Sequence, residues 1–281
     1  MKKYIVIGNP IEHSFSPLVH NYWMKKYGLI DSVYEKKKVE EKDLEHLINK
    51  IRNDEIIGIN VTVPFKKKII PFLDKLDIFA KDTQSVNTVK KTKNKIVGYN
   101  TDGPGFGKTL DNFYSQTNSK VEAIDSILSG KNIFILGAGG VTPSIISILE
   151  QRGGNIFISN RTRGKAEELK KLFPKTQVLD WGKKPKAYDI VINTTSVGLM
   201  KDEKINIDFN DCNKDEDKLF YDLIYNPRET NFLKEARLRG NKIMNGQMMF
   251  LYQAIFAFHI WTNITPEIND ELIKLLDRWL K

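Results

Sequence analysis

Two polar side chains far apart in the sequence are candidates for a proton-transfer pair. Lys66 ends the segment INVTVPFK, in which an apolar strand leads into a helix expected over 66–73. Lys67 and Lys68 share the first turn of that helix, where the helix dipole disfavours each cation by about 0.3–1 kcal/mol. A buried lysine in that field suits proton transfer, whereas Lys67 and Lys68 fit an exposed surface. Asp102, in the later segment GYNTDG, is the carboxylate best placed to pair with Lys66, although turn chemistry alone would explain that segment.

Hydroxyl and amide side chains gather at other strand ends. The segment NPIEHSFSP places Ser14 and Ser16 two residues apart, before a helix expected from about Pro17. Two such hydroxyls, together with the amides of a helix start, can hold a carboxylate. Ser16 alone would fit equally well as a helix cap, so both interpretations stay open. The segment SVNTV adds Asn87 at the end of another short strand.

A glycine-rich turn predicts a binding site for a dinucleotide. Gly137, Ala138, Gly139 and Gly140 follow the buried-type strand NIFIL and precede a helix expected over about 141–152. Glycines there let the backbone approach a pyrophosphate, and the helix N-terminus offers amides and a positive dipole. The third position of the fingerprint is Thr142 instead of glycine, which departs from the commonest NAD-type pattern.

The end of the next strand predicts which nucleotide binds. NAD enzymes place Asp or Glu about 20 residues after the glycines to accept the ribose hydroxyls, but Asn160 stands there. The residues that follow supply three cations and a hydroxyl, at Arg161, Thr162, Arg163 and Lys165, but no carboxylate. A 2′-phosphate carries up to two negative charges, so this loop favours NADP over NAD.

The elements that position these residues fall into two α/β domains. Three strand-like runs (YIVIG, SVYEKKKV, IIGINVTV) alternate with helix-like stretches at the start of the chain, which predicts parallel strands with helical crossovers. Two further short strands, SVNTV and KIVGYN, follow, and the first domain, of mixed α/β type, covers residues 1–114. A polar segment, 115–120, ends that domain, and a second alternation through 246 has the βαβ rhythm of a Rossmann-type sheet. Two C-terminal helices, over 248–261 and from Pro266 onward, are expected to return to the first domain, so that residues 247–281 complete it.

Composition narrows the class of protein. The formal charge of +9 comes from 44 Lys and Arg interleaved with 35 Asp and Glu, so we expect a lysine-rich surface and no nucleic-acid partner. The longest apolar runs are shorter than a membrane span or the core of a signal peptide, which predicts a cytoplasmic chain without a membrane partner. A single cysteine, Cys212, and four scattered histidines indicate neither a disulfide nor a metal site.

Several segments together make the chain similar to the shikimate dehydrogenase family. They are NPIEHSFSP, NVTVPFK, SVNTV, GYNTDG, GAGG with the later NRTRGKA, INTTSVGL, DLIYNP and NGQMMFLYQ. The resemblance implies an N-terminal substrate domain, an NADP(H)-binding domain, and the NADPH-dependent, reversible reduction of 3-dehydroshikimate to shikimate in aromatic amino acid and chorismate biosynthesis. The segment INTTS departs from the NATS that members commonly have, and Phe250 stands where leucine is usual.

The resemblance also implies a role for particular residues. Lys66 and Asp102 would be the catalytic pair. The substrate would be bound by Ser14, Ser16, Asn60, Thr62, Asn87, Tyr225 and Gln253. The cofactor would be bound by Gly137, Ala138, Gly139, Gly140, Asn160, Arg161, Thr162 and Lys165, with Gly246 and Met249 near the nicotinamide.

Two other interpretations remain at this point. A quinate/shikimate dehydrogenase that uses NAD would share fold and site, and a basic binding protein would keep the fold without the activity. The substrate is expected to be a small molecule, and the chain a monomer or a homodimer.

Overall fold

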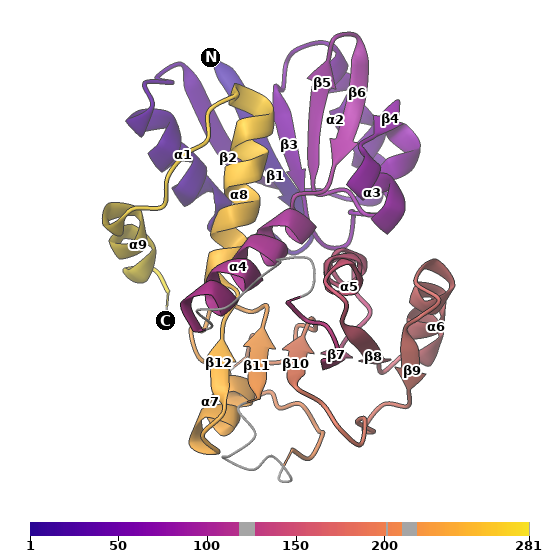
Figure 1. Ribbon diagram of the computed structural model, residues 1–281. Coiled ribbons are helices and arrows are strands. Elements are labelled where there is room, and N and C mark those ends of the chain that lie inside the picture. The colour runs from indigo at the N-terminus through magenta and orange to yellow at the C-terminus, as the bar shows by residue number, and fades with distance from the viewer. Residues whose placement is uncertain (118–126, 201, 210–217, 281) are drawn as a thin grey trace. The chain divides into compact units, whose positions relative to one another are not determined.

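Two α/β units make up the chain (Figure 1). The computed structural model describes residues 1–117, 127–200, 202–209 and 218–280. One unit comprises Met1–Gly105 together with Leu251–Trp279, and the other comprises Phe106–Phe250 with the last residues of the chain. The predicted two-domain α/β class is confirmed. The functions assigned to the two domains, with boundaries at 114/115 and 246/247, stay predictions.

The first unit has a six-stranded mixed sheet. Its strands are β1 (Lys2–Gly8), β2 (Ser32–Lys38), β3 (Gly58–Val61), β4 (Lys75–Leu76), β5 (Thr88–Thr92) and β6 (Lys95–Tyr99), in the order β2-β1-β3-β5-β6-β4. β1 runs parallel to both of its neighbours, but β5 is antiparallel to β3 and β6. The predicted parallel pairing of the first three strands is confirmed. β5 and β6 pair antiparallel because only two residues, Lys93 and Asn94, join them, and a parallel pair needs a longer crossover.

Helices cover both faces of this sheet. They are α1 (Ser16–Lys26), α2 (Leu44–Arg52), α3 (Ile78–Thr83), α9 (Asp270–Asp277) and the part of α8 (Gln247–Thr262) that starts at Leu251, with short 3₁₀ turns at Glu41–Asp43 and Ile70–Phe72. The apolar face of α2 packs against odd-numbered strand residues such as Ile5 and Ile59. On the opposite face Trp261 of α8 lies directly over Gly58, where an added Cβ would come within 2.3 Å of the indole Nε1.

Two helix boundaries differ from the expectation. α9 begins at Asp270, not at Pro266, because the side chain of Asn269 accepts a hydrogen bond from the amide of Leu272 and caps the helix. No helix covers 66–73: residues 66–69 form turns, followed by the 3₁₀ turn at Ile70–Phe72. Pro71 has no amide hydrogen for a bond to the preceding turn, so a helix cannot propagate through it.

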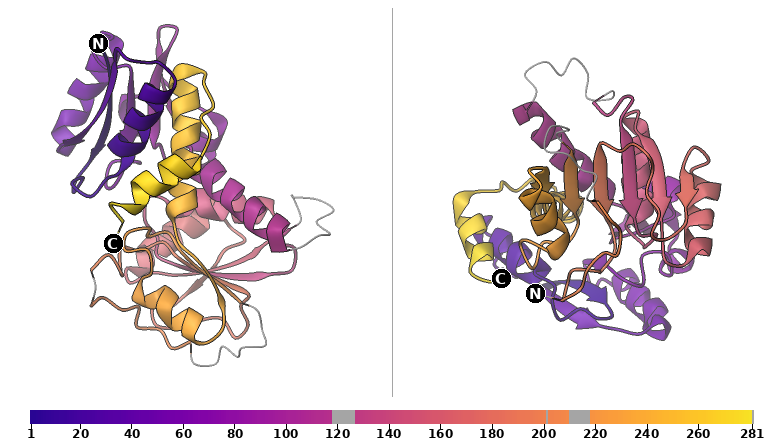
Figure 2. Two further views of the ribbon diagram at one scale, coloured as in Figure 1. Left: turned by 90° about the vertical axis from the view of Figure 1, so that its left-hand side faces the viewer. Right: turned by 90° about the horizontal axis from the view of Figure 1, so that it is seen from below.

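The second unit has a six-stranded parallel sheet. Its strands are β7 (Asn132–Leu136), β8 (Asn155–Ser159), β9 (Gln177–Leu179), β10 (Ile190–Asn193), β11 (Leu219–Asp222) and β12 (Lys242–Met244), in the order β12-β11-β10-β7-β8-β9. The helices are α4 (Asp102–Thr117, mostly in this unit), α5 (Thr142–Gln151), α6 (Arg163–Leu172) and α7 (Asn231–Leu238), and the sheet is strongly twisted (Figure 2). α7 and β12 were not predicted from the sequence.

The strand order reverses between β7 and β10, which makes this the topological switch point of a doubly wound sheet. Ligands of such sheets bind beyond the carboxyl ends of the strands at that point. The glycine-rich turn follows β7, and residues 194–198 follow β10.

The described residues include no helix that is long and apolar enough to cross a membrane. Within the same residues, His, Cys, Asp and Glu form no group of three that could hold a metal ion. Cys212 and residues 118–120 of the predicted polar segment lie outside the described residues.

Candidate active site

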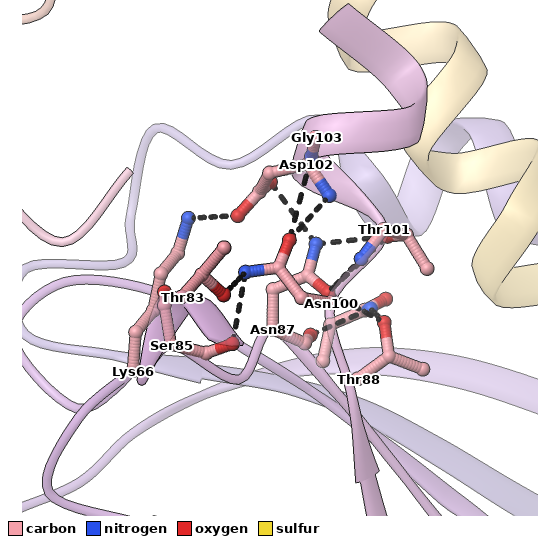
Figure 3. Close-up of polar contacts among 10 residues, drawn as sticks. Lys66, Thr83, Ser85, Asn87, Thr88, Asn100, Thr101, Asp102 and Gly103 are labelled. Carbon is pink, nitrogen blue, oxygen red and sulfur yellow. Dashed lines mark hydrogen bonds and ion pairs between the residues drawn. The ribbon is translucent and has the colours of Figure 1, made fainter. Parts of the chain in front are cut away.

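The first unit brings Lys66 and Asp102 together in a buried ion pair. The Nζ atom of Lys66 lies 2.6 Å from Oδ2 of Asp102, and the two side chains are only 10% and 9% exposed (Figure 3). The prediction that Lys66 lies in the dipole field of a helix is wrong, because Lys66 lies in a turn. Its electrostatic partner is Asp102. Removing one member of a buried pair leaves an uncompensated charge, which costs about 3–5 kcal/mol.

Asp102 is held in place from three sides. It is the first residue of α4, and its amide donates to Oδ1 of Asn100 at 3.0 Å. Its second carboxylate oxygen, Oδ1, accepts a hydrogen bond of 3.0 Å from Nδ2 of Asn87. Asn87 is fixed in turn by Thr101, whose amide donates to Oδ1 of Asn87 at 2.8 Å. The carboxylate therefore keeps a fixed orientation toward the Lys66 ammonium (Figure 3).

The paired serines lie at the start of α1. The hydroxyl of Ser14 donates to that of Ser16 at 3.2 Å, and the amide of Ser16 donates to Oγ of Ser14 at 3.3 Å. Ser16 is the first residue of the helix and makes no capping bond, so the alternative interpretation as a helix cap is wrong. Two adjacent hydroxyls next to a helix N-terminus have the geometry to bind a carboxylate.

The other predicted substrate residues are divided between the units. Asn60, which is 7% exposed, lies near the end of β3 in the first unit, and half-buried Thr62 is the first residue after that strand. Gln253 belongs to the same unit, where its backbone lies so close to Gly105 that a Cβ there would come within 2.8 Å of the Gln253 nitrogen. Tyr225 belongs to the second unit, where its ring stacks on Phe250 with centroids 4.7 Å apart.

The glycine-rich turn of the second unit has the shape of a phosphate-binding loop. Gly137 has φ +106°, and a Cβ there would lie 2.7 Å from Oγ1 of Thr194, so no other residue fits. Gly139 is exposed, and a Cβ on it would meet nothing within 4 Å. The amide of Ala138 donates to Oδ1 of Asn160 at 3.0 Å, which ties the loop to the end of β8. The backbone is thus open to a diphosphate in front of α5.

Thr142 stabilises this loop at the position where glycine is usual. Its hydroxyl accepts a bond of 3.0 Å from the amide of Gly139 and lies 3.3 Å from the Gly137 carbonyl. It also lies 2.9 Å from Oγ1 of Thr194, which in turn donates to the carbonyl of Leu136. Two of the three departures noted in the sequence, Thr142 and Thr194 of INTTS, therefore contact each other across the switch point.

The cations after β8 differ in what they contact. Arg163 pairs with Asp180 and with Glu167 at 3.0 Å. Arg161 and Lys165 are exposed and make no ion pair within the part of the chain that the structure describes. Asn160 donates to the carbonyl of Thr162, which holds the turn that presents Arg161. Asn160 stands at the end of β8 where NAD-binding sheets place a carboxylate, and the neighbouring Asp180 is paired with Arg163, so this strand end suits a nucleotide with a 2′-phosphate.

A buried carboxylate lies at the end of β11. Asp222 is fully buried and accepts hydrogen bonds from Thr230 Oγ1 at 2.6 Å, Asn193 Nδ2 at 3.0 Å and the Ile224 amide at 3.0 Å. Burial raises the pKa of Asp222 to about 6, and the three hydrogen bonds oppose that shift. These contacts organise the loop that carries Tyr225.

Gly246 and Met249, the residues expected near the nicotinamide, also lie in the second unit. Gly246 is so close to Leu223 that a Cβ would come within 2.0 Å of its carbonyl oxygen, and Met249 is 7% exposed. Sequence reasoning did not identify Tyr34, Thr88 or Asp222 as parts of these networks. One signal was available for Tyr34, because it is the single aromatic residue in the lysine-rich strand SVYEKKK.

Comparison with known proteins gives consistent relatives over nearly the whole chain. Residues 6–89 match the model of a shikimate dehydrogenase substrate binding domain, and residues 119–241 match the model of shikimate/quinate 5-dehydrogenase. The chain is 49% identical over 277 residues to a shikimate dehydrogenase (NADP(+)) of Pelagibacter ubique, covering 98% of this chain and 99% of that one.

Solved structures agree. The shikimate 5-dehydrogenase of Thermus thermophilus in complex with NADP(H) and shikimate is 27% identical, with a TM-score of 0.83 and complete coverage of both chains. The enzyme of Listeria monocytogenes in complex with shikimate and NAD is 28% identical, with a TM-score of 0.84 over 98% of this chain and 96% of that one.

Proposed function

The chain belongs to the shikimate dehydrogenase family, and from this premise we propose that Lys66 and Asp102 move the proton in the NADPH-dependent reduction of 3-dehydroshikimate to shikimate. The chain is an NADP-dependent oxidoreductase acting on a CH–OH group, and the reaction is reversible. The observation that carries the proposal is the 2.6 Å contact between two side chains that are each about nine-tenths buried.

The residues at the switch point of the second unit fit NADP. The turn from Gly137 to Gly140 would hold the pyrophosphate against the start of α5, and Arg161, with Thr162 and Lys165, would hold the 2′-phosphate. Gly246 and Met249 would lie along the nicotinamide. When bound, NADPH supplies the hydride that reduces the ketone.

The first unit supplies the acid and the substrate contacts. The Lys66 ammonium donates to the C3 oxygen of the substrate, stabilises negative charge as it develops there, and transfers the proton. Asp102 keeps the ammonium in position and lowers the cost of burying it. Ser14 and Ser16 bind the carboxylate, while Thr62, Asn87 and Gln253, with Asn60, surround the ring. Tyr225, in the second unit, is the remaining predicted substrate residue.

Replacement of Lys66 tests this assignment. Lys66→Met should reduce kcat for shikimate oxidation by at least about 100-fold, since a positioned acid or base typically contributes 10²–10⁴-fold. The rate is followed as NADPH absorbance at 340 nm. Lys67→Met is the matched control, because Lys67 is exposed and adjacent. A Lys66→Met variant with near-normal kcat would remove this lysine from the mechanism.

The same assay separates the alternatives. Turnover with quinate and NAD⁺ above that with shikimate and NADP⁺ would favour the quinate/shikimate interpretation, and no turnover of any pair would favour a binding protein. We further propose a cytoplasmic location, because the sequence has a single cysteine, as is usual in a reducing compartment. We also propose a monomer or homodimer, because a net charge of +9 disfavours self-association.

A further inference from the structure

A buried tyrosine that was not among the predicted site residues contacts two of them. Tyr34, in the middle of β2, is 1% exposed, and its hydroxyl donates to Oδ1 of Asn60 at 2.6 Å. The side chain of Ser16 also hydrogen-bonds to this hydroxyl. Burial raises the pKa of Tyr34 well above its usual value, and the bond from Ser16 only partly opposes this. The phenol therefore stays protonated and can donate a hydrogen bond at every working pH.

The contacts of Asn60 fix the direction of its amide. Its Nδ2 atom lies 3.0 Å from the carbonyl oxygen of Asn87 and 3.0 Å from Oγ1 of Thr88. A backbone carbonyl can only accept a hydrogen bond, so nitrogen must face it and oxygen must face Tyr34. Both amide hydrogens of Asn60 are thus used within the protein. Its contribution to a substrate is therefore to position other groups.

From Asn60 the hydrogen bonds run in one direction to the catalytic carboxylate. Thr88 receives a bond from Asn60 and donates to Oδ1 of Asn87 at 3.1 Å. Asn87 donates to Oδ1 of Asp102 at 3.0 Å, and Asp102 holds Lys66 at its other oxygen. Hydrogen bonds that point the same way polarise one another, so the orientation at one end influences the other.

Aromatic packing holds the Tyr34 ring. The ring of His20 stacks on it with centroids 4.3 Å apart and an angle of 5°. Burial lowers the pKa of His20 to about 3, so this neighbour is an uncharged ring. Tyr4 lies beside Tyr34 in the β1–β2 register, and both contact Trp261. Unlike Tyr34, Tyr4 makes no hydroxyl hydrogen bond to the residues that the structure describes.

We propose that Tyr34 is a positioning residue for the substrate, because its hydroxyl fixes the Asn60 amide and, through Thr88, the side chains of Asn87, which meets the substrate ring, and of Asp102, which holds Lys66. This inference rests on the proposed function for the roles of Asn87 and Asp102. Without the phenol hydroxyl, Oδ1 of Asn60 loses its donor at a buried position. The Asn87 carbonyl still favours the nitrogen on its side, but the amide is then held at one end only and its contact with Thr88 is loosened.

Steady-state kinetics of Tyr34→Phe tests the proposal. We expect kcat/KM for shikimate to fall by about tenfold, which corresponds to about 1.4 kcal/mol, while KM for NADP⁺ stays within about twofold. Tyr4→Phe removes a hydroxyl from the same aromatic cluster and should leave both values unchanged. In an Asn60→Ala background, Tyr34→Phe should cause a much smaller further loss, limited to the hydrogen bond with Ser16, because most of its effect passes through Asn60.

A second variant keeps the test independent of how well Tyr34→Phe folds. Asn60→Asp retains an acceptor for Tyr34 but loses the hydrogens that reach Asn87 and Thr88, so it should lose kcat/KM for shikimate as well. The proposal is overturned if Tyr34→Phe or Asn60→Asp behaves as wild type, if Tyr4→Phe loses as much, or if the losses at Tyr34 and Asn60 are additive. Inactive wild-type protein would instead refute the proposed function.

Discussion

The hydroxyl of Thr142 should set the affinity for the cofactor. Thr142 is completely buried and its hydroxyl has three partners, the Gly139 amide, the Gly137 carbonyl and Thr194. Thr142→Val keeps the shape of the side chain and removes all three contacts. With neutral hydrogen bonds contributing about 0.5–1.5 kcal/mol each, and Gly139 exposed enough to bond water, we expect a loss of about 1–3 kcal/mol in unfolding free energy.

Part of that loss should appear in binding, because the freed residues form the turn that meets the pyrophosphate. We expect the dissociation constant for NADPH, measured by fluorescence titration, to rise by about tenfold, or about 1.4 kcal/mol. KM for shikimate should change little. Thr142→Ser restores the hydroxyl and should recover most of the affinity.

Thr194→Val separates the contact across the switch point from the contacts within the loop. This substitution removes the hydrogen bond between Thr142 and Thr194 but leaves the bond between Thr142 and the Gly139 amide. We therefore expect the free energy of unfolding to fall by about 1 kcal/mol and the affinity for NADPH to change little. If folded Thr142→Val binds NADPH as tightly as wild type, the loop does not depend on this hydroxyl and the reasoning is wrong.

Two further outcomes follow from charges in the second unit. Arg161→Ala should raise KM for NADP⁺ by about 10- to 100-fold and leave KM for NAD⁺ nearly unchanged, because it removes a charge-assisted hydrogen bond of about 1.5–3 kcal/mol. Arg163→Ala is the control, because Arg163 is already paired with Asp180 and Glu167. Equal effects of Arg161→Ala on both nucleotides would contradict a 2′-phosphate contact. Asp222 should make the free energy of unfolding fall as pH rises. Burial raises the pKa of Asp222 from 3.8 to about 6, so the folded state binds the proton more tightly than the unfolded state. The resulting stabilisation of about 3 kcal/mol is fully present below pH about 4 and is lost above pH about 6. Urea unfolding of wild type and Asp222→Asn between pH 4 and 7.5 measures this, and parallel curves for the two proteins would speak against it.

Local signals in the sequence predicted the parts of the fold that depend on local chemistry. The strand, glycine turn and helix around Gly137 were predicted nearly to the residue, because the turn needs a positive φ and the helix follows immediately. The prediction of a helix over 66–73 was wrong, because Pro71 limits this segment to turns and a 3₁₀ turn. β5 was expected at SVNTV but covers Thr88–Thr92, because its pairing with β3 and β6 sets its ends.

The side chains that orient the site were beyond reach of the sequence for a different reason. An asparagine amide has two orientations of almost the same shape, and the sequence alone does not distinguish them. At Asn60 the choice depends on Tyr34, which is 26 residues away, and on a carbonyl 27 residues away. Neither distance corresponds to any helical or strand period.

In both proposed ligand sites a buried hydroxyl orients the groups that meet the ligand. Lys66 and Arg161 can be identified in the sequence because they are charged side chains that follow strand ends. A charged group contributes to binding or catalysis only when neighbouring polar groups fix its position and that of its partner. In the first unit Tyr34 holds the amide that leads to Asp102, and in the second Thr142 holds the turn that meets the pyrophosphate. Both are uncharged hydroxyls in buried positions, where an unpaired group costs more than a bond gains. Loss of either hydroxyl should therefore affect one ligand and spare the other, which a general loss of stability would not do.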